Sequence, residues 1–136
     1  MRLSRPGAAA ARGGLTRIMA TSELLQKSCT PCRGGMPPLT PDEAQRLKAQ
    51  APNWQILDES RRIERTYSFP NFRDAYSLVQ RVSELAEEEG HHPDISFGWG
   101  FATISLQTKK IMGLHENDFI MATKIDALAE KAGVRP

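Results

Sequence analysis

The chain has 136 residues, of which 40% are hydrophobic and 25% charged, and its formal net charge is +2. This length and composition are typical of one ordinary globular domain. The basic residues are scattered and no apolar run approaches the length of a membrane span, so we expect neither a nucleic acid nor a membrane as partner.

The beginning of the chain differs from the rest in composition. Residues 1–22 carry arginine, alanine and glycine and no acidic residue. Such a segment builds no core, so we predict a disordered N-terminal extension and a Cys/Pro/Gly loop over residues 1–37. Two explanations stay open: an organelle transit peptide, which would place the protein in a mitochondrion or plastid, or a start assigned too early. We favour the second, with Met19 as the true start of a cytoplasmic protein.

The loop contains a Cys-x-x-Cys pair, Cys29 and Cys32. Such a pair can ligate zinc or act in redox chemistry. Zinc needs about four ligands, no second cysteine pair exists, and redox pairs normally open a helix after a strand. We therefore predict a structural or spectator role, with a zinc site shared with the later histidines as the alternative.

The first helix is expected to begin at Thr40. Thr40 and Glu43 have the spacing of a capping box, and the helix should stop before Pro52. Residues 54–57 indicate a short strand. Residues 62–69 alternate between apolar and polar side chains, so they predict a second strand, close enough to the first to form a hairpin.

The clearest amphipathic helix follows Asn71, which can cap it. Gly90 stands where a helix C-terminal cap is expected, after three glutamates at 87–89. Apolar residues recur at helical spacing between these two ends. They are Ala75, Leu78, Val79, Val82 and Leu85.

Two adjacent histidines, His91 and His92, lie between this helix and the next strand. Histidine changes its protonation near neutral pH, so the pair is a candidate for acid–base chemistry. The other interpretation is a pair of surface loop residues. Under the functional interpretation, one of the preceding glutamates faces the pair and stabilises an imidazolium.

The rest of the chain predicts a second hairpin and a last helix. Residues 94–97 and 101–108 indicate its two strands, and residues 109–114 a loop. The last helix starts near His115 and runs to about Ala132. Its inner stripe is Met121, Ile125 and Leu128.

Residues 38–136 thus predict a single α+β domain with the order α-β-β-α-β-β-α. Two hairpins joined by a helix favour a four-stranded antiparallel sheet with three helices packed on one face. The histidine pair and the loop at Lys109 would meet at one end of this sheet. The sequence has no phosphate-binding glycine loop, Ser-His-Asp order or dinucleotide fingerprint.

Several motifs in fixed order resemble the pterin-4a-carbinolamine dehydratase family. They are Glu87, His91-His92-Pro93, Trp99 and the helix start Asn117-Asp118-Phe119. The resemblance covers roughly residues 38–130 and implies dehydration of 4a-hydroxytetrahydrobiopterin to quinonoid dihydropterin. This lyase reaction recycles the pterin of aromatic amino acid hydroxylases, phenylalanine hydroxylation included, and requires no metal or other cofactor.

The resemblance also implies roles for individual residues. His91 would be the general acid/base, His92 would bind and orient the pterin or share the proton transfer, and Glu87 would hold an imidazole. The remaining residues that the resemblance assigns to substrate binding are Pro93, Thr108, Lys109, Lys110 and Asp118.

One position departs from the family pattern, because Lys109 stands where a third histidine is usual. A lysine ammonium keeps its proton near neutral pH and is a poor proton shuttle. We therefore predict a dehydratase that is weakened or altered in stereoisomer preference. The alternative is a catalytically weakened member that acts as a dimerisation or partner-binding protein. The family also implies a homodimer or homotetramer, to which Phe101 and Thr103 could contribute on the uncovered sheet face.

Overall fold

The computed structural model describes residues 23–132. Its helices and strands follow the predicted order, with one added 3₁₀ turn after the last strand. They are α2 (Pro41–Lys48), β1 (Gln55–Leu57), β2 (Arg62–Ser68), α3 (Phe72–Glu89), β3 (Asp94–Gly98), β4 (Phe101–Leu106), η2 (Lys109–Ile111) and α4 (Glu116–Lys131). The predictions for residues 1–22, both the transit peptide and the start at Met19, lie outside the described residues.

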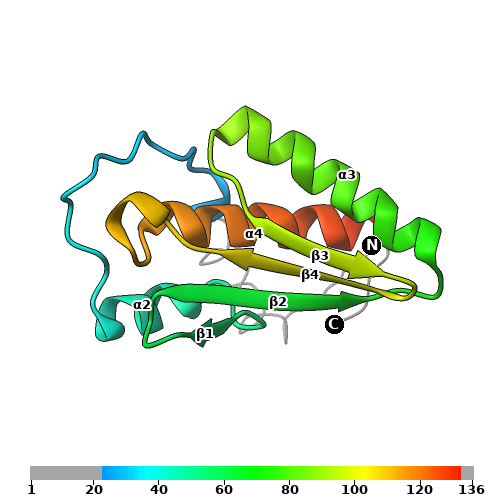
Figure 1. Ribbon diagram of the computed structural model, residues 1–136, viewed down its shortest axis with the longest axis horizontal. Coiled ribbons are helices and arrows are strands. Elements are labelled where there is room, and N and C mark those ends of the chain that lie inside the picture. Colours follow the sequence, from blue (N-terminus) through cyan, green and yellow to red (C-terminus); the bar gives the residue numbers. More distant parts are fainter. Residues whose placement is uncertain (1–22, 133–136) are drawn as a thin grey trace, which may run out of the picture.

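The four strands form one antiparallel sheet in the order β1-β2-β4-β3. The two hairpins therefore join through their second strands, β2 and β4. Figure 1 shows α3 and α4 crossing the same face of this sheet. The predicted α+β class, with helices on one face of a four-stranded antiparallel sheet, is confirmed. None of the helices within residues 23–132 is long and apolar enough to cross a membrane.

The alternation of side chains along the strands explains which face is covered. Ile63 and Tyr67 of β2 and Ile104 of β4 are buried beneath the helices. Arg65 points the same way and is paired with Asp126 of α4 at 2.7 Å. Asp126 also accepts hydrogen bonds from the Trp54 indole and the Tyr67 hydroxyl, so this carboxylate ties α4 to the sheet.

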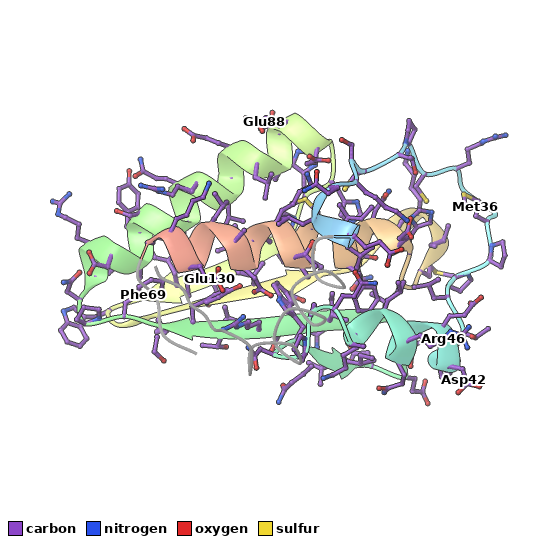
Figure 2. The ribbon with its side chains drawn as sticks, turned by 180° about the vertical axis from the view of Figure 1, so that it is seen from behind. Met36, Asp42, Arg46, Phe69, Glu88 and Glu130 are labelled. Atoms are coloured by element: carbon purple, nitrogen blue, oxygen red, sulfur yellow. The ribbon has the colours of Figure 1, made fainter. Side chains whose placement is uncertain are left out.

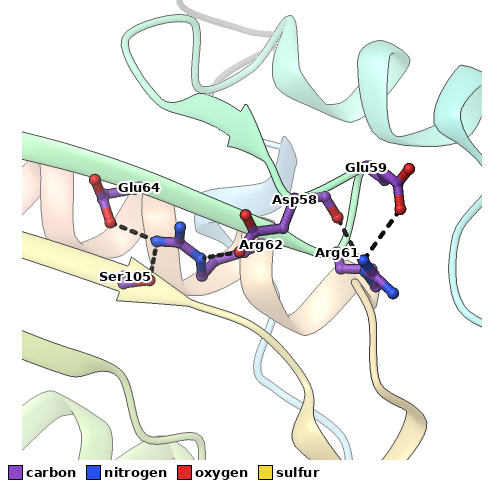
Figure 3. A network of polar contacts seen from close by, with 6 residues as sticks. All are labelled: Asp58, Glu59, Arg61, Arg62, Glu64 and Ser105. Carbon is purple, nitrogen blue, oxygen red and sulfur yellow. Dashed lines mark hydrogen bonds and ion pairs between the residues drawn. The ribbon is translucent and has the colours of Figure 1, made fainter.

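The opposite face of the sheet is polar and open. Figure 3 shows Arg62 at the centre of a network on this face. Its guanidinium donates to Asp58 at 2.8 Å, to Glu64 at 2.5 Å and to the Ser105 hydroxyl of β4 at 3.0 Å. The network links the turn before β2 to β4. This face keeps its polar side chains in solvent, as the period of two predicted.

Helix α4 is more deeply buried than its sequence pattern predicted. Met121 and Ile125 of the expected stripe are fully buried, and Leu128 is partly buried. Phe119 and Ile120 are buried as well. The reason is that α4 lies between the sheet, α3 and α2, so its first turns have hardly any solvent side (Figure 1).

The described chain before α2 packs onto the domain, and the expected domain start at residue 38 stays a prediction. Leu24 is 1% exposed and belongs to the hydrophobic core. Further along, the Leu39 N–H donates to the Leu114 carbonyl at 2.9 Å. The described segment over residues 23–37 is therefore attached to the domain at both ends. It is the blue to cyan arch in Figure 1.

Candidate active site

The histidine pair is placed by the end of α3. Asn71 caps the first turn of this helix, and Gly90 closes the last turn with a left-handed φ of 67°. The N–H groups of Gly90 and His91 both donate to the Ala86 carbonyl, at 2.9 and 3.2 Å. Because the chain leaves the helix immediately after this cap, His91 and His92 are fixed close to its last turn.

His91 is paired with a buried carboxylate. Its Nε2 lies 2.6 Å from Oδ1 of Asp118, whose side chain has no exposed surface. The other oxygen of Asp118 accepts from the Thr108 hydroxyl at 2.8 Å and from the His115 main-chain N–H at 3.0 Å. Asp118 lies in the first turn of α4, where the helix dipole stabilises negative charge. A carboxylate only accepts, so Nε2 of His91 carries a proton and Nδ1 is left for other contacts.

His92 has a different partner and is far more exposed. Its Nε2 lies 2.6 Å from Glu87 Oε2, and the two side chains are 61% and 78% exposed. Glu87 therefore holds His92, whereas Asp118 holds His91. Figure 2 shows Glu88 on the outer side of α3. The expectation that one of the three glutamates faces the pair thus applies to Glu87 and His92.

A cavity of about 520 Å³ lies beside the pair. Its size is in the range of small-molecule sites. Four parts of the chain line it: the loop before α2, the end of α3 with the turn after it, the end of β4 with the turn after it, and the first turn of α4. The lining residues are Cys29, Thr30, Pro31, Cys32, Glu89, Gly90, His91, His92, Gln107, Thr108, Lys109, Lys110 and Asn117.

The predicted site residues divide into two groups. Five of them line the cavity: His91, His92, Thr108, Lys109 and Lys110.

The other three, Glu87, Pro93 and Asp118, are not among the lining residues. Asp118 is fully buried beneath His91, so its contact is with the imidazole and not with the cavity. Asp118 lies where it can position His91. Its assignment to substrate binding stays a prediction.

Lys109 lies at the rim of the cavity. Its ammonium is 3.3 Å from Asp94 Oδ1, and both side chains are 66% exposed. Thr108 exchanges main-chain hydrogen bonds with Gly113, which closes the turn that presents Lys109 and Lys110. An ammonium there can donate a hydrogen bond to a ligand.

The Cys-x-x-Cys segment lies on the opposite side of the same cavity. The Cys29 N–H donates to Glu89 at 2.8 Å, and Thr30 exchanges hydrogen bonds with the Asn117 side chain. Both Cys29 and Cys32 are free thiols. The described residues contain no group of three or more His, Cys, Asp or Glu side chains placed to share a metal ion, so the zinc alternative finds no support there.

The prediction of a spectator role for Cys29 and Cys32 does not include their position in the same cavity as the histidines. Sequence reasoning also missed Glu89 and Asn117, which hold the segment. One feature of the sequence could have indicated this packing. A Pro/Gly-rich loop with two cysteines that form no disulfide can still be held against the domain by other contacts.

We expect Cys29 to be nearly inert to alkylation. Its burial and the neighbouring Glu89 carboxylate raise the pKa of its thiol to about 12. Its thiolate at pH 8 is then on the order of 10³-fold scarcer than that of a free thiol, which ionises near 8.5. With iodoacetamide at pH 8, peptide mass spectrometry should show Cys29 reacting at least about 100-fold more slowly than glutathione. Equal rates for the two would contradict this placement of Cys29.

Comparisons with known proteins agree on one family. A family model described as pterin 4 alpha carbinolamine dehydratase matches residues 37–128. A protein of Azoarcus sp. (strain BH72) with the provisional name pterin-4-alpha-carbinolamine dehydratase is 61% identical over 108 residues, covering 79% of this chain and 92% of the relative. A relative of the same provisional name from Methylococcus capsulatus is 51% identical over 114 residues, covering 84% and 100%.

A solved structure agrees with these sequence matches. The crystal structure of a transcriptional coactivator/pterin dehydratase from Brucella melitensis matches with a TM-score of 0.64 at 28% identity. The match covers 68% of this chain and 98% of that one.

Proposed function

Because this chain belongs to the pterin 4 alpha carbinolamine dehydratase family, we propose that it dehydrates 4a-hydroxytetrahydrobiopterin to quinonoid dihydropterin. The observation that carries the proposal is His91 at the wall of a cavity with its Nε2 2.6 Å from the buried Asp118. The reaction recycles the oxidised pterin that an aromatic amino acid hydroxylase leaves.

The reaction needs two proton transfers. The bond between the ring carbon and its hydroxyl breaks, and the oxygen leaves as water after taking a proton from an acid. The neighbouring ring nitrogen gives its proton to a base, and a carbon–nitrogen double bond forms. Imidazoles suit both steps near neutral pH, each typically for a factor of about 10²–10⁴.

The two histidines differ in what they can contribute. Asp118 orients His91 through Nε2, so its Nδ1 is the nitrogen that would exchange a proton with the pterin. His92 is held by Glu87 at the exposed side of the cavity, where it would orient the pterin or exchange the second proton with solvent. The direct test is the rate of water loss from enzymatically generated 4a-hydroxytetrahydrobiopterin, compared with the spontaneous rate.

We expect Lys109 to limit this activity. An imidazole at position 109 would line the cavity and would supply the proton exchange that an ammonium does not. Lys109→His should therefore raise kcat by about tenfold, a conservative part of the range for a positioned acid–base group. The matched control is Lys131→His, on an exposed helix end, which should leave kcat unchanged. A Lys109→His variant with a kcat no higher than that of the parent protein would contradict this prediction.

A second candidate function is partner binding with little or no catalysis. Exposed aromatic side chains gather at the end of the molecule opposite the cavity: Phe72 and Tyr76 of α3, and Trp99 in the β3–β4 turn, which is 72% exposed. Phe97 packs between the first two, with ring centroids 5.4 Å from Phe72 and 6.4 Å from Tyr76. Exposed patches of this kind favour protein contacts, including a second copy in a homodimer or homotetramer. Dehydration no faster than the spontaneous rate would favour this function.

A further inference from the structure

The segment over residues 29–32, here called the strap, is fastened to the domain through its main chain. The Thr30 N–H donates to Oδ1 of Asn117 at 3.0 Å, and Nδ2 of Asn117 donates to the Thr30 carbonyl at 2.7 Å. This reciprocal pair imitates the contact between neighbouring strands. It fixes the position of the strap backbone whatever side chain residue 30 carries.

Both hydrogen bonds of the Asn117 side-chain amide are made to Thr30, and Asn117 itself also lines the cavity. Asn117 is 2% exposed. A buried amide is costly unless its hydrogen bonds are made, so its presence at the start of α4 is explained by the strap. Its neighbour Asp118 holds His91, so two consecutive residues of α4 position opposite walls of one cavity.

Glu89 forms the second attachment of the strap to the domain. Its carboxylate accepts from the Cys29 N–H at 2.8 Å and pairs with the Lys124 ammonium at 3.3 Å. Burial opposes its ionisation, but these two contacts hold the pKa of the Glu89 carboxyl below its ordinary value. The carboxylate is therefore charged at neutral pH, and the hydrogen bond from Cys29 is charge-assisted.

The chain on either side of the strap is packed. Upstream, Leu24 is buried in the core. Downstream, Pro38 packs so closely on Gly113 that a Cβ there would lie 2.5 Å from Pro38 Cβ. The arch in Figure 1 therefore spans two packed ends, and its residues 29–32 line the cavity. A segment ordered before the ligand arrives adds affinity, because its ordering cost is already met in folding.

Resting on the proposed function, we propose that the strap is a wall of the pterin cavity and that Asn117 and Glu89 are the positioning residues that hold it. All four strap residues line the same cavity as His91 and His92. A flat bicyclic ring needs a surface on both faces. The strap supplies one such surface, with Pro31 and the thiols of Cys29 and Cys32 as its contact groups.

The test is the affinity for 7,8-dihydrobiopterin measured by titration calorimetry, which needs no turnover. Asn117→Ala should raise Kd about tenfold, equivalent to about 1.4 kcal/mol. Asn53→Ala, an exposed asparagine beside β1, is the matched control and should bind as the parent does. Glu89→Gln keeps an oxygen acceptor for Cys29, so it should bind more tightly than Glu89→Ala.

A second measurement uses the strap itself. Saturating 7,8-dihydrobiopterin should slow alkylation of Cys32 in the parent protein, because Cys32 lines the cavity. Pterin binding with no protection of Cys32, or with equal affinity in Asn117→Ala, would overturn the strap as a wall and leave the proposed function standing. A parent protein that binds no pterin would overturn both.

Discussion

Replacing His91 by alanine is expected to lower kcat for dehydration by about 10²–10⁴, the usual contribution of a positioned acid–base group. The substitution removes the imidazole that Asp118 orients toward the cavity, while the cap at Gly90 and the bond from the main-chain N–H to Ala86 stay in place. The circular dichroism spectrum should change little, whereas leaving the buried Asp118 without this partner should cost about 1–3 kcal/mol of stability. The measurement is single-turnover water loss from 4a-hydroxytetrahydrobiopterin, followed by ultraviolet absorbance.

The chain offers a matched histidine as control. His115 caps α4 by accepting from the Asn117 N–H, and it is not among the cavity-lining residues. His115→Asn keeps a good capping side chain and should keep kcat within about twofold, since asparagine is among the preferred N-caps. If His91→Ala were as fast as His115→Asn, the imidazole at 91 would have no part in the reaction.

Local signals explain why much of the fold could be predicted from the sequence. Asn71 and Gly90 mark the two ends of α3 within its own residues, and the alternation in β2 marks its buried face. The histidine pair was placed correctly between α3 and β3 for the same reason. Each of these features depends on neighbours a few residues away, so periodicity and capping rules apply directly.

The partners of the site could not be predicted, because they come from distant parts of the chain. His91 and Asp118 are 27 positions apart, and Thr30 and Asn117 are 87 apart. Three consecutive glutamates look alike in sequence, yet Glu87 faces His92, Glu88 faces outward and Glu89 holds the strap. Only the packing of α3 against α4 decides which carboxylate faces which partner.

The second large effect is expected from Asp118→Asn. This change preserves the size of the side chain. Both oxygens of the Asp118 carboxylate now accept hydrogen bonds, and in asparagine one of them is replaced by an amide nitrogen, which donates. If the amide nitrogen faces Nε2 of His91, the imidazole has to move its proton to Nδ1, the nitrogen proposed to act on the pterin. In serine proteases an aspartate that fixes a histidine tautomer contributes about 10⁴ in kcat, so we expect a loss of about 10²–10⁴ here. The tautomer can be read from nitrogen chemical shifts of His91 by NMR.

The Asp126→Asn variant tests whether a lower kcat comes from a mispositioned His91 or only from a destabilised α4. Asp126 lies on the same helix and accepts from Trp54, Arg65 and Tyr67, so its substitution weakens a comparably buried network. It is not among the cavity-lining residues, however. We expect both variants to lose about 1–3 kcal/mol of stability through impaired buried hydrogen bonds. Asp118→Asn should also change the His91 tautomer and the pH profile of kcat, whereas Asp126→Asn should change neither. Equal kcat values for the two variants would mean that the buried carboxylate beneath His91 serves the fold and not the reaction.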